Sequence, residues 1–316
     1  MEQMLTVEMQ IANRARNHPN EALTNLHEFI NEGMLHLSFE ELNKKATSGV
    51  DGETWVSYDE KRSERIPQLL AAFKSGKYLA PNIRRAYILK GDGNFRPLGI
   101  PTVEDKVLQK AVTDVLTPVY EQMFHPTSYG FRPGKSQYQA LEMLFKEVSF
   151  KNMRYIIDVD MQNYFGSINH QRLREFLDRR IKDGVIRKMI DKWLKAGVME
   201  NGVIAYPTEG TPQGGMISPL LSNVYLHYVL DEWFIEQIKP LLKGASFLIR
   251  YADDFLLGFT NREDAMRVMQ VLPRRLGKYG LTLHPEKTKL IDMEASKPEQ
   301  SSTFAFLGFT HYMSKS

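Results

Sequence analysis

Two adjacent carboxylates, Asp253 and Asp254, stand between two apolar, strand-forming runs at 247–252 and 255–259. This pattern predicts a β-hairpin with the acid pair at its turn. Carboxylates held together at the end of buried strands repel each other, and a divalent cation, which prefers hard oxygen ligands, relieves that repulsion. The hairpin is therefore a candidate metal site. The alternative is a plain solvated Asp–Asp turn, because Asp is common in turns.

A second acidic group ends another predicted strand, residues 154–160. Side chains alternate along a strand, so Asp158 and Asp160 share one face. Asp160, Asp253 and Asp254 together can hold two divalent ions, which in two-metal sites activate an attacking oxygen and stabilise a leaving oxygen during phosphoryl transfer. Mg²⁺ binds few carboxylates together with substrate phosphates, which suits this number of acids. The sequence contains no Cys, and we find no His/Cys cluster of the kind that holds zinc.

A predicted hairpin with strands at 84–90 and 95–101 carries basic side chains. Arg and Lys pair with phosphate oxygens, so Lys90 and Arg96 suit a nucleoside triphosphate. A solvated basic hairpin is the alternative. The Gly-Lys-Ser/Thr ending of a Walker loop is absent.

Nucleic-acid contacts are expected at four further basic residues. Arg84 and Arg85 lie in the first strand of the same hairpin, and Arg132 and Lys135 lie in the loop 129–136. That loop mixes aromatic rings with cations, which a nucleic-acid strand uses for stacking and phosphate pairing. An ordinary turn before the next helix is the alternative for this loop.

Composition sets the broad class. The chain has 316 residues, of which 42% are hydrophobic and 25% charged, as in a soluble globular protein of one large or two ordinary domains. The net charge of +3 does not by itself indicate a nucleic-acid binder, so a basic surface would require local clustering. We expect a cytoplasmic protein, because a signal sequence, a membrane span and cysteine are all absent from the sequence.

Predicted helices and turns are expected to position these candidate side chains. Thr102 is expected to cap a helix. A basic amphipathic helical region is expected over 171–195 and a helix over 220–235, the latter preceded by a glycine turn with Gln213. In the helix after Asn261, Pro273 is expected to cause a kink.

In chain order from Thr47, these motifs resemble a reverse transcriptase, and specifically the polymerase part of a group II intron-encoded protein. One four-residue motif would be weak, but the resemblance runs through ordered blocks. The blocks are 48–52, 95–101, 129–136, 160–165, 211–214, 217–223, 251–254 and 306–309.

The resemblance implies roles for the acids. Asp160, Asp253 and Asp254 are similar to the catalytic, metal-binding carboxylates of the family, with the backbone carbonyl of Met161 as an additional ligand. The implied cofactor is a pair of Mg²⁺ ions, for which Mn²⁺ can substitute.

The resemblance also implies nucleotide and primer contacts. Lys90 and Arg96 resemble the cations on the incoming triphosphate, and Gln213 resembles the glutamine beside the nucleotide. Phe165 resembles the gate residue whose ring clashes with a ribose 2′-OH. The other implied contacts are Lys287 near the triphosphate, as a proton donor to pyrophosphate, and Leu307 and Gly308 in the primer grip.

The implied fold is α+β: a right-hand polymerase with an antiparallel palm sheet packed on helices. We expect a helical N-terminal extension over 1–78, helix-rich fingers over 79–150 and a palm over 151–316 with interleaved fingers segments. Relatives continue into a helical thumb, and this chain stops at Ser316, so the thumb is expected to be absent.

The implied function is RNA-directed DNA synthesis. The protein would extend a DNA or RNA primer 3′-OH with deoxynucleotides on an RNA template. An alternative is an RNA-binding splicing cofactor, or maturase, that binds intron RNA and polymerises secondarily. Another is a domesticated reverse transcriptase in phage defence or CRISPR adaptation. An RNA-dependent RNA polymerase is opposed by Phe165.

Overall fold

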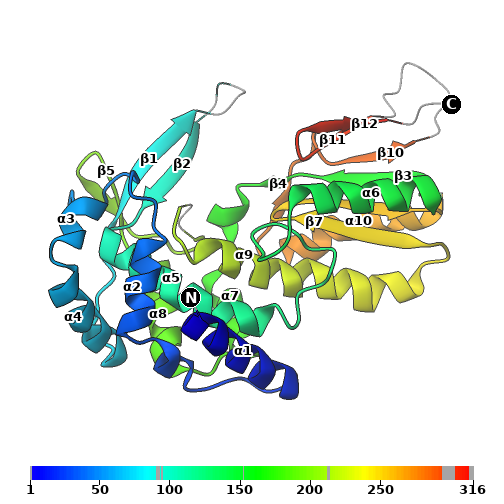
Figure 1. Cartoon of the computed structure of the whole chain (residues 1–316). Helices are drawn as coiled ribbons and strands as arrows, with labels where there is room; N and C mark the ends of the chain where they lie inside the picture. Colours follow the sequence, from blue (N-terminus) through cyan, green and yellow to red (C-terminus); the bar gives the residue numbers. More distant parts are fainter. Residues whose placement is uncertain are drawn as a thin grey trace. The chain divides into compact units, whose positions relative to one another are not determined.

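The computed structural model describes residues 2–89, 93, 95–151, 153–211, 214–293 and 303–312 (Figure 1). Contacts divide the chain into two compact units. The first unit comprises Met1–Met123 and Asn169–Ser222, and the second comprises Phe124–Ile168 and Asn223–Ser316. Both units mix helices and sheet, as expected for the α+β class. Within the described ranges, no helix combines the length and apolar character needed to cross a bilayer.

The first unit contains a four-stranded sheet in the order β2-β1-β5-β6. β1 (Ile83–Leu89) and β2 (Phe95–Ile100) form the predicted antiparallel hairpin. β5 (Val198–Glu200) pairs in parallel with β1 and antiparallel with β6 (Val203–Ala205). The helical elements of this unit are α1 (Glu2–Asn17), η1 (Leu26–Phe29), α2 (Glu32–Glu40), α3 (Trp55–Asp59), α4 (Arg62–Lys74), α5 (Val103–Tyr120), α7 (His170–Asp178) and α8 (Gly184–Leu194).

Helix α5 is the buried centre of the first unit, in contact with α1 and α2. Thr102 caps it as predicted, its side chain accepting a hydrogen bond from the Asp105 amide. Asp105 is buried and accepts hydrogen bonds from Trp193 Nε1 at 2.7 Å and from Tyr78 and Gln109. Burial raises the pKa of Asp105 to about 6, although these donors oppose the rise.

The second unit is organised around an antiparallel sheet in the order β10-β3-β8-β7. Two short antiparallel pairs accompany it: the hairpin of β11 with β12, and β4 with β9, which lie far apart in the sequence. The strands are β3 (Tyr155–Val159), β4 (Met161–Gln162), β7 (Ser246–Tyr251), β8 (Asp254–Phe259), β9 (Thr282–Leu283), β10 (Lys289–Asp292), β11 (Phe304–Phe306) and β12 (Phe309–His311).

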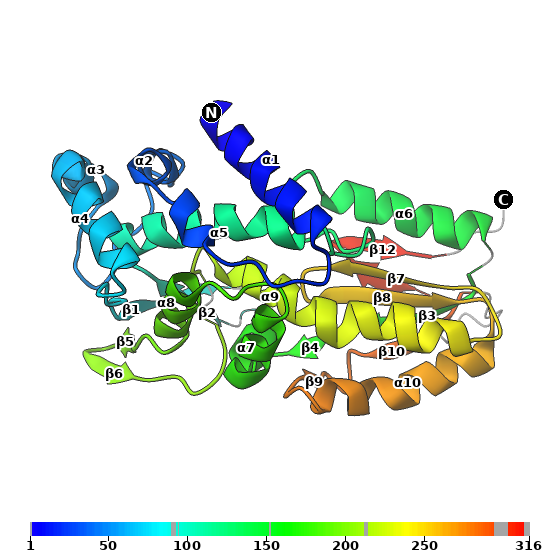
Figure 2. The same ribbon diagram turned by 90° about the horizontal axis from the view of Figure 1, so that it is seen from below.

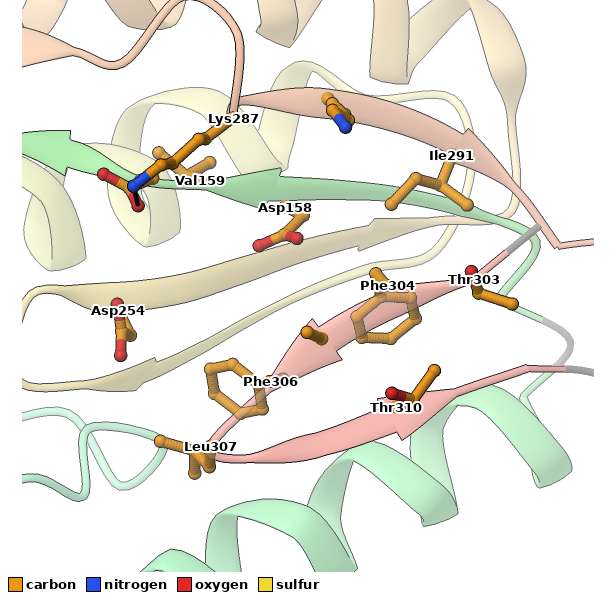
Figure 3. Close-up of a pocket in the computed structure, with 13 residues that line it drawn as sticks. Asp158, Val159, Asp254, Lys287, Ile291, Thr303, Phe304, Phe306, Leu307 and Thr310 are labelled. Carbon is orange, nitrogen blue, oxygen red and sulfur yellow. Dashed lines mark ion pairs between the residues drawn. The ribbon is translucent and has the colours of Figure 1, made fainter. Parts of the chain in front are cut away.

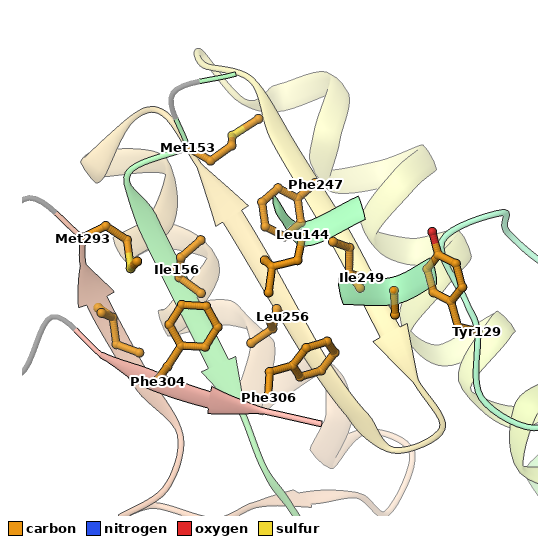
Figure 4. Packing of buried hydrophobic residues seen from close by; sticks show 12 residues of the cluster. Tyr129, Leu144, Met153, Ile156, Phe247, Ile249, Leu256, Met293, Phe304 and Phe306 are labelled. Atoms are coloured by element: carbon orange, nitrogen blue, oxygen red, sulfur yellow. The ribbon is translucent and has the colours of Figure 1, made fainter. Parts of the chain in front are cut away.

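Helices cover both faces of this sheet. Figure 2 shows α6 (Gln137–Phe150) on one face and α10 (Arg262–Gly277) on the other. On the α6 face, Leu144 packs in one buried cluster with Phe247 and Leu256 of the sheet and with β11 (Figure 4). Gly258 permits this packing, because a Cβ there would lie 2.0 Å from the Phe247 ring.

Two of the predicted helices are divided. The region expected over 171–195 breaks between α7 and α8, where the buried Arg180 donates to backbone carbonyls of residues 15–21. The backbone on either side of Ile181 also hydrogen-bonds to Leu23 in an isolated β-bridge, so it does not continue the helix.

The helix expected over 220–235 is α9 (Ser218–Leu226), followed by the π-helical turns η3 (His227–Asp231) and η4 (Trp233–Ile238) and by the short 3₁₀ turn η5 (Lys239–Leu241). Helix α10 continues past Pro273 to Gly277.

Candidate active site

Strand pairing in the second unit brings the predicted acids together. Val159 of β3 pairs with Phe255 of β8. Asp160 directly follows Val159, and Asp254 directly precedes Phe255, so the two acids lie at the same end of this strand pair. Asp158 and Asp160 line the same pocket, which agrees with the predicted shared face.

These acids line one pocket of about 520 Å³ in the second unit (Figure 3). The acidic end is formed by β3 and β8, and the apolar end by β10 and the β11–β12 hairpin. The lining residues are Asp158, Val159, Asp160, Asp254, Lys287, Lys289, Ile291, Thr303, Phe304, Ala305, Phe306, Leu307 and Thr310.

Asp160 is held by the loop that leads into β10. Its carbonyl oxygen accepts hydrogen bonds from the His284 amide at 2.8 Å and from the Thr288 hydroxyl at 3.3 Å. The Nζ atom of Lys287 lies 3.6 Å from Asp160 Oδ2. The resemblance indicated Lys287 near the triphosphate, and the structure brings it to the same pocket as Asp160.

Negative charge accumulates in this pocket. Burial raises the pKa of Asp158 to about 6, and the charges of Asp254 and Asp160 add to that rise. Lys289, which pairs with Asp158 across the sheet, partly opposes it. A cation in the pocket would relieve this repulsion.

The donor set fits a hard divalent cation that arrives with a phosphate ligand. In the described ranges, no three Asp, Glu, His or Cys residues are grouped as a preformed metal site. Asp160 and Asp254 nevertheless face one pocket, and Mg²⁺ commonly binds one or two carboxylates together with substrate phosphates and water.

Asp253 and Met161 lie beside the pocket and outside its described lining. The predicted hairpin is present, but its two-residue turn comprises Ala252, with a φ of +57°, and Asp253. Asp254, predicted at the turn with Asp253, is instead the first residue of β8 and pairs with Tyr251. Met161 lies in β4, paired with Leu283, and its side chain is buried. Their metal-binding roles stay predictions.

Two other predicted sites belong to the second unit. Phe165 lies in the turn η2 (Tyr164–Ser167), half-buried, with its ring centroid 5.4 Å from that of Tyr164. Leu307 and Gly308 form the turn between β11 and β12, with φ of +52° and +82°. Positive φ at both positions is typical of a type I′ hairpin turn, for which glycine is well suited.

The remaining nucleotide contacts are less defined. Lys90 and Gln213 lie outside the described residues. Arg96 is exposed on β2 of the first unit, opposite Ile88. Their predicted roles toward a triphosphate stay predictions.

Several of the basic residues predicted to contact nucleic acid bind the protein itself. Arg84 donates from two nitrogens to the carbonyl of Ser48, and Arg85 is half-buried on the same strand. The buried Arg132 donates to the carbonyls of His125 and Ser128. Lys135 Nζ lies 3.2 Å from the carbonyl of Pro126. Whether these residues also contact nucleic acid stays a prediction.

Sequence reasoning placed Asp158 beside Asp160 without assigning it to the site. The i, i+2 spacing on a strand was the available signal, and the structure shows that Asp158 lines the pocket. Lys289 carried no comparable signal, because its place depends on the pairing of β10 with β3.

The chain is similar to known proteins over most of its length. A family model described as "Reverse transcriptase (RNA-dependent DNA polymerase)" matches residues 88–311. Protein YkfC of Escherichia coli (strain K12) is 30% identical over 294 residues, which cover 83% of this chain and 75% of YkfC. Group II intron-encoded protein LtrA of Lactococcus lactis subsp. cremoris is 35% identical over 244 residues, which cover 76% of this chain and 40% of LtrA.

An uncharacterized 91 kDa protein in the cob intron of Schizosaccharomyces pombe is 34% identical over 232 residues, covering 72% of this chain and 28% of that protein. The chain belongs to the reverse transcriptase family, within the group that includes group II intron-encoded proteins. It spans three quarters of YkfC but less than half of LtrA and of the cob-intron protein.

Proposed function

We propose that this chain is an RNA-directed DNA polymerase of the group II intron type, with a right-hand polymerase fold whose palm lies in the second unit. The observation that carries this proposal is the pocket in which Asp160 and Asp254, from distant parts of the sequence, meet Lys287 and the β11–β12 turn. The family match supports it independently.

The proposed reaction is primer extension on an RNA template. The primer 3′ oxygen forms a bond to the α-phosphorus of a deoxynucleoside triphosphate. The bond from that phosphorus to the bridging oxygen breaks, pyrophosphate leaves, and the hydroxyl proton is lost to solvent. Lys287, exposed at the pocket beside Asp160, is suited to bind the triphosphate and to donate a proton to the departing pyrophosphate.

Asp160, Asp253 and Asp254 would hold two Mg²⁺ ions, with Mn²⁺ able to substitute. When bound, such ions supply Lewis-acid stabilisation of the negative charge that develops on the phosphate oxygens. The carboxylates contribute fixed negative charge at the end of a rigid sheet, so the ion sites need little rearrangement. Phe165 would exclude a ribose 2′-OH and so favour deoxynucleotides.

Primer extension tests this proposal. The wild-type chain, Asp253→Ala and the control Asp178→Ala are each given an RNA template, a DNA primer, four deoxynucleotides and Mg²⁺. Asp178 is an exposed acid that pairs with Arg187 in the first unit. We expect extension by wild type and control, and none by Asp253→Ala or after chelation of Mg²⁺. Extension that survives in Asp253→Ala, or no extension by the folded wild type, would contradict the proposal.

The names of the intron-encoded relatives favour a second, compatible role, the binding of intron RNA. Filter binding compares a group II intron RNA with a structured RNA of equal length. Tighter binding of the intron RNA would support the maturase role, and equally weak binding of both would count against it.

A further inference from the structure

The guanidinium of Arg250 is fully buried on the sheet face opposite the pocket. Arg250 pairs with Phe255 across β7 and β8, whereas Asp254 pairs with Tyr251, so alternation directs Arg250 and Asp254 to opposite faces. Arg250 Nε and Nη2 bind the two carboxylate oxygens of the buried Asp231 at 2.8 and 2.6 Å. This pairing fixes the plane of the guanidinium.

The remaining nitrogen of Arg250 reaches the turn that carries the acid pair. Nη1 donates to Asn223 Oδ1 at 2.8 Å and to the carbonyl oxygen of Ala252 at 3.0 Å. That carbonyl belongs to the peptide that joins Ala252 to Asp253. Ala252 has a φ of +57°, which is strained for a residue with a side chain and persists only where the surroundings fix it.

The segment 129–130 holds the same turn from another side. The Tyr129 amide donates to the Arg250 carbonyl at 2.8 Å, and Asn223 Nδ2 donates to the Gly130 carbonyl at 2.8 Å. A Cβ at Gly130 would lie 2.3 Å from the Ala252 nitrogen, so this backbone packs directly on the turn. Asn223 therefore links the Arg250 guanidinium to the segment that packs on Ala252.

We propose that Arg250, aligned by Asp231 and Asn223, is a positioning residue for Asp253 and Asp254. Its Nη1 fixes the peptide between Ala252 and Asp253 and thereby the direction in which both carboxylates leave the turn. This inference rests on the proposed polymerase function. Arg250 acts through the backbone and does not contact substrate.

Arg250→Lys is the informative variant. Lysine keeps the positive charge, but a single ammonium cannot make two parallel bonds to Asp231 and also hold Asn223 and Ala252. The matched control is Arg154→Lys. Arg154 also pairs through two nitrogens with an aspartate, Asp292, in the same unit. It precedes Tyr155, which pairs with Phe259 at the end of β8 away from the 251–254 turn.

Two measurements are made on each variant: single-turnover incorporation of one deoxynucleotide, and amide hydrogen exchange followed by mass spectrometry. For Arg250→Lys we expect the incorporation rate to fall about a hundredfold, as for a reacting group displaced by about 1 Å, with nucleotide affinity changed less than about threefold. We expect exchange in 250–256 to accelerate about tenfold while exchange in 155–159 is unchanged. The control should match wild type in both measurements.

Three results would overturn the inference. The first is unchanged exchange in 250–256, the second is an incorporation rate close to wild type, and the third is faster exchange throughout the unit, which would indicate a structural role only. If Arg250→Lys does not fold, Asn223→Ala replaces it. We then expect smaller changes in the same direction, both in the incorporation rate and in exchange over 250–256. If wild type incorporates no nucleotide, the polymerase proposal fails, and the exchange measurement alone decides whether Arg250 positions the turn.

Discussion

The Nζ atom of Lys287 lies 3.6 Å from Oδ2 of Asp160, and the loop that carries this lysine also binds the backbone of Asp160. The two side chains are 60% and 39% exposed, so their attraction contributes at most about 1 kcal/mol to stability. The importance of the pair is its position. An exposed cation lies beside a carboxylate that is proposed to hold a metal ion, in the pocket proposed to bind the triphosphate.

We predict that Lys287→Met lowers the single-turnover rate of nucleotide incorporation by about a hundredfold, the usual contribution of a general acid. Lys287→Arg should restore nucleotide affinity but little of the rate, because a guanidinium retains its proton. The rate and the nucleotide dissociation constant are measured for both, with Lys278→Met, an exposed lysine of the second unit, as control. A Lys287→Met rate within twofold of wild type would exclude this role.

Phe165 is predicted to set sugar selectivity. Its ring is half-buried beside Tyr164, so Phe165→Val removes ring volume without opening a fully buried core position. We expect kcat/KM for ribonucleotides relative to deoxynucleotides to rise at least about tenfold, because a steric barrier to the 2′-OH is lost. Phe145→Val, at an exposed aromatic of α6, is the control. The gate assignment is wrong if the ratio does not change.

The sequence predicted those parts of this site that depend on residues within a few positions of one another. Two apolar, strand-forming runs on either side of an acid pair predicted the hairpin of Asp253 and Asp254, and the i, i+2 spacing placed Asp158 on the same face as Asp160. The capped helix after Thr102 followed from the same local rules.

What the sequence left open depends on tertiary contact. Arg132 and Arg250 are residues of a type that is normally exposed, yet both are buried and paired within the protein. The break between α7 and α8 arises where the chain pairs with Leu23, far away in sequence. The spacing of apolar residues within 171–195 gives no indication of a partner so far away in the sequence.

Stability of the second unit should depend on pH through His227. Burial lowers the pKa of His227 to about 4, from an ordinary value of 6.5. Between pH 6.5 and pH 4 the imidazole of His227 binds a proton in the unfolded chain but not in the folded one. The contribution of neutral, buried His227 to the free energy of unfolding is therefore fully present above pH 6.5 and is lost as the pH falls toward 4. The shift corresponds to about 3 kcal/mol.

Urea unfolding at pH 7 and pH 4 measures this contribution. We expect the free energy of unfolding of wild type to fall by about 3 kcal/mol more than that of His227→Phe between these pH values. His18→Gln, at an exposed histidine, should behave as wild type. An equal fall in wild type and His227→Phe would show that the buried imidazole does not titrate as described.

The most direct test of the central claim is single-turnover incorporation of one complementary deoxynucleotide by wild type, Asp160→Asn and Asp254→Asn. Each substitution removes one negative charge from a crowded pocket, so neither should lower the unfolding temperature. If this pocket performs the chemistry, each variant should lose at least about a thousandfold in rate while binding primer–template within about threefold of wild type. A variant that keeps more than about a tenth of the wild-type rate would show that the reaction occurs without these carboxylates.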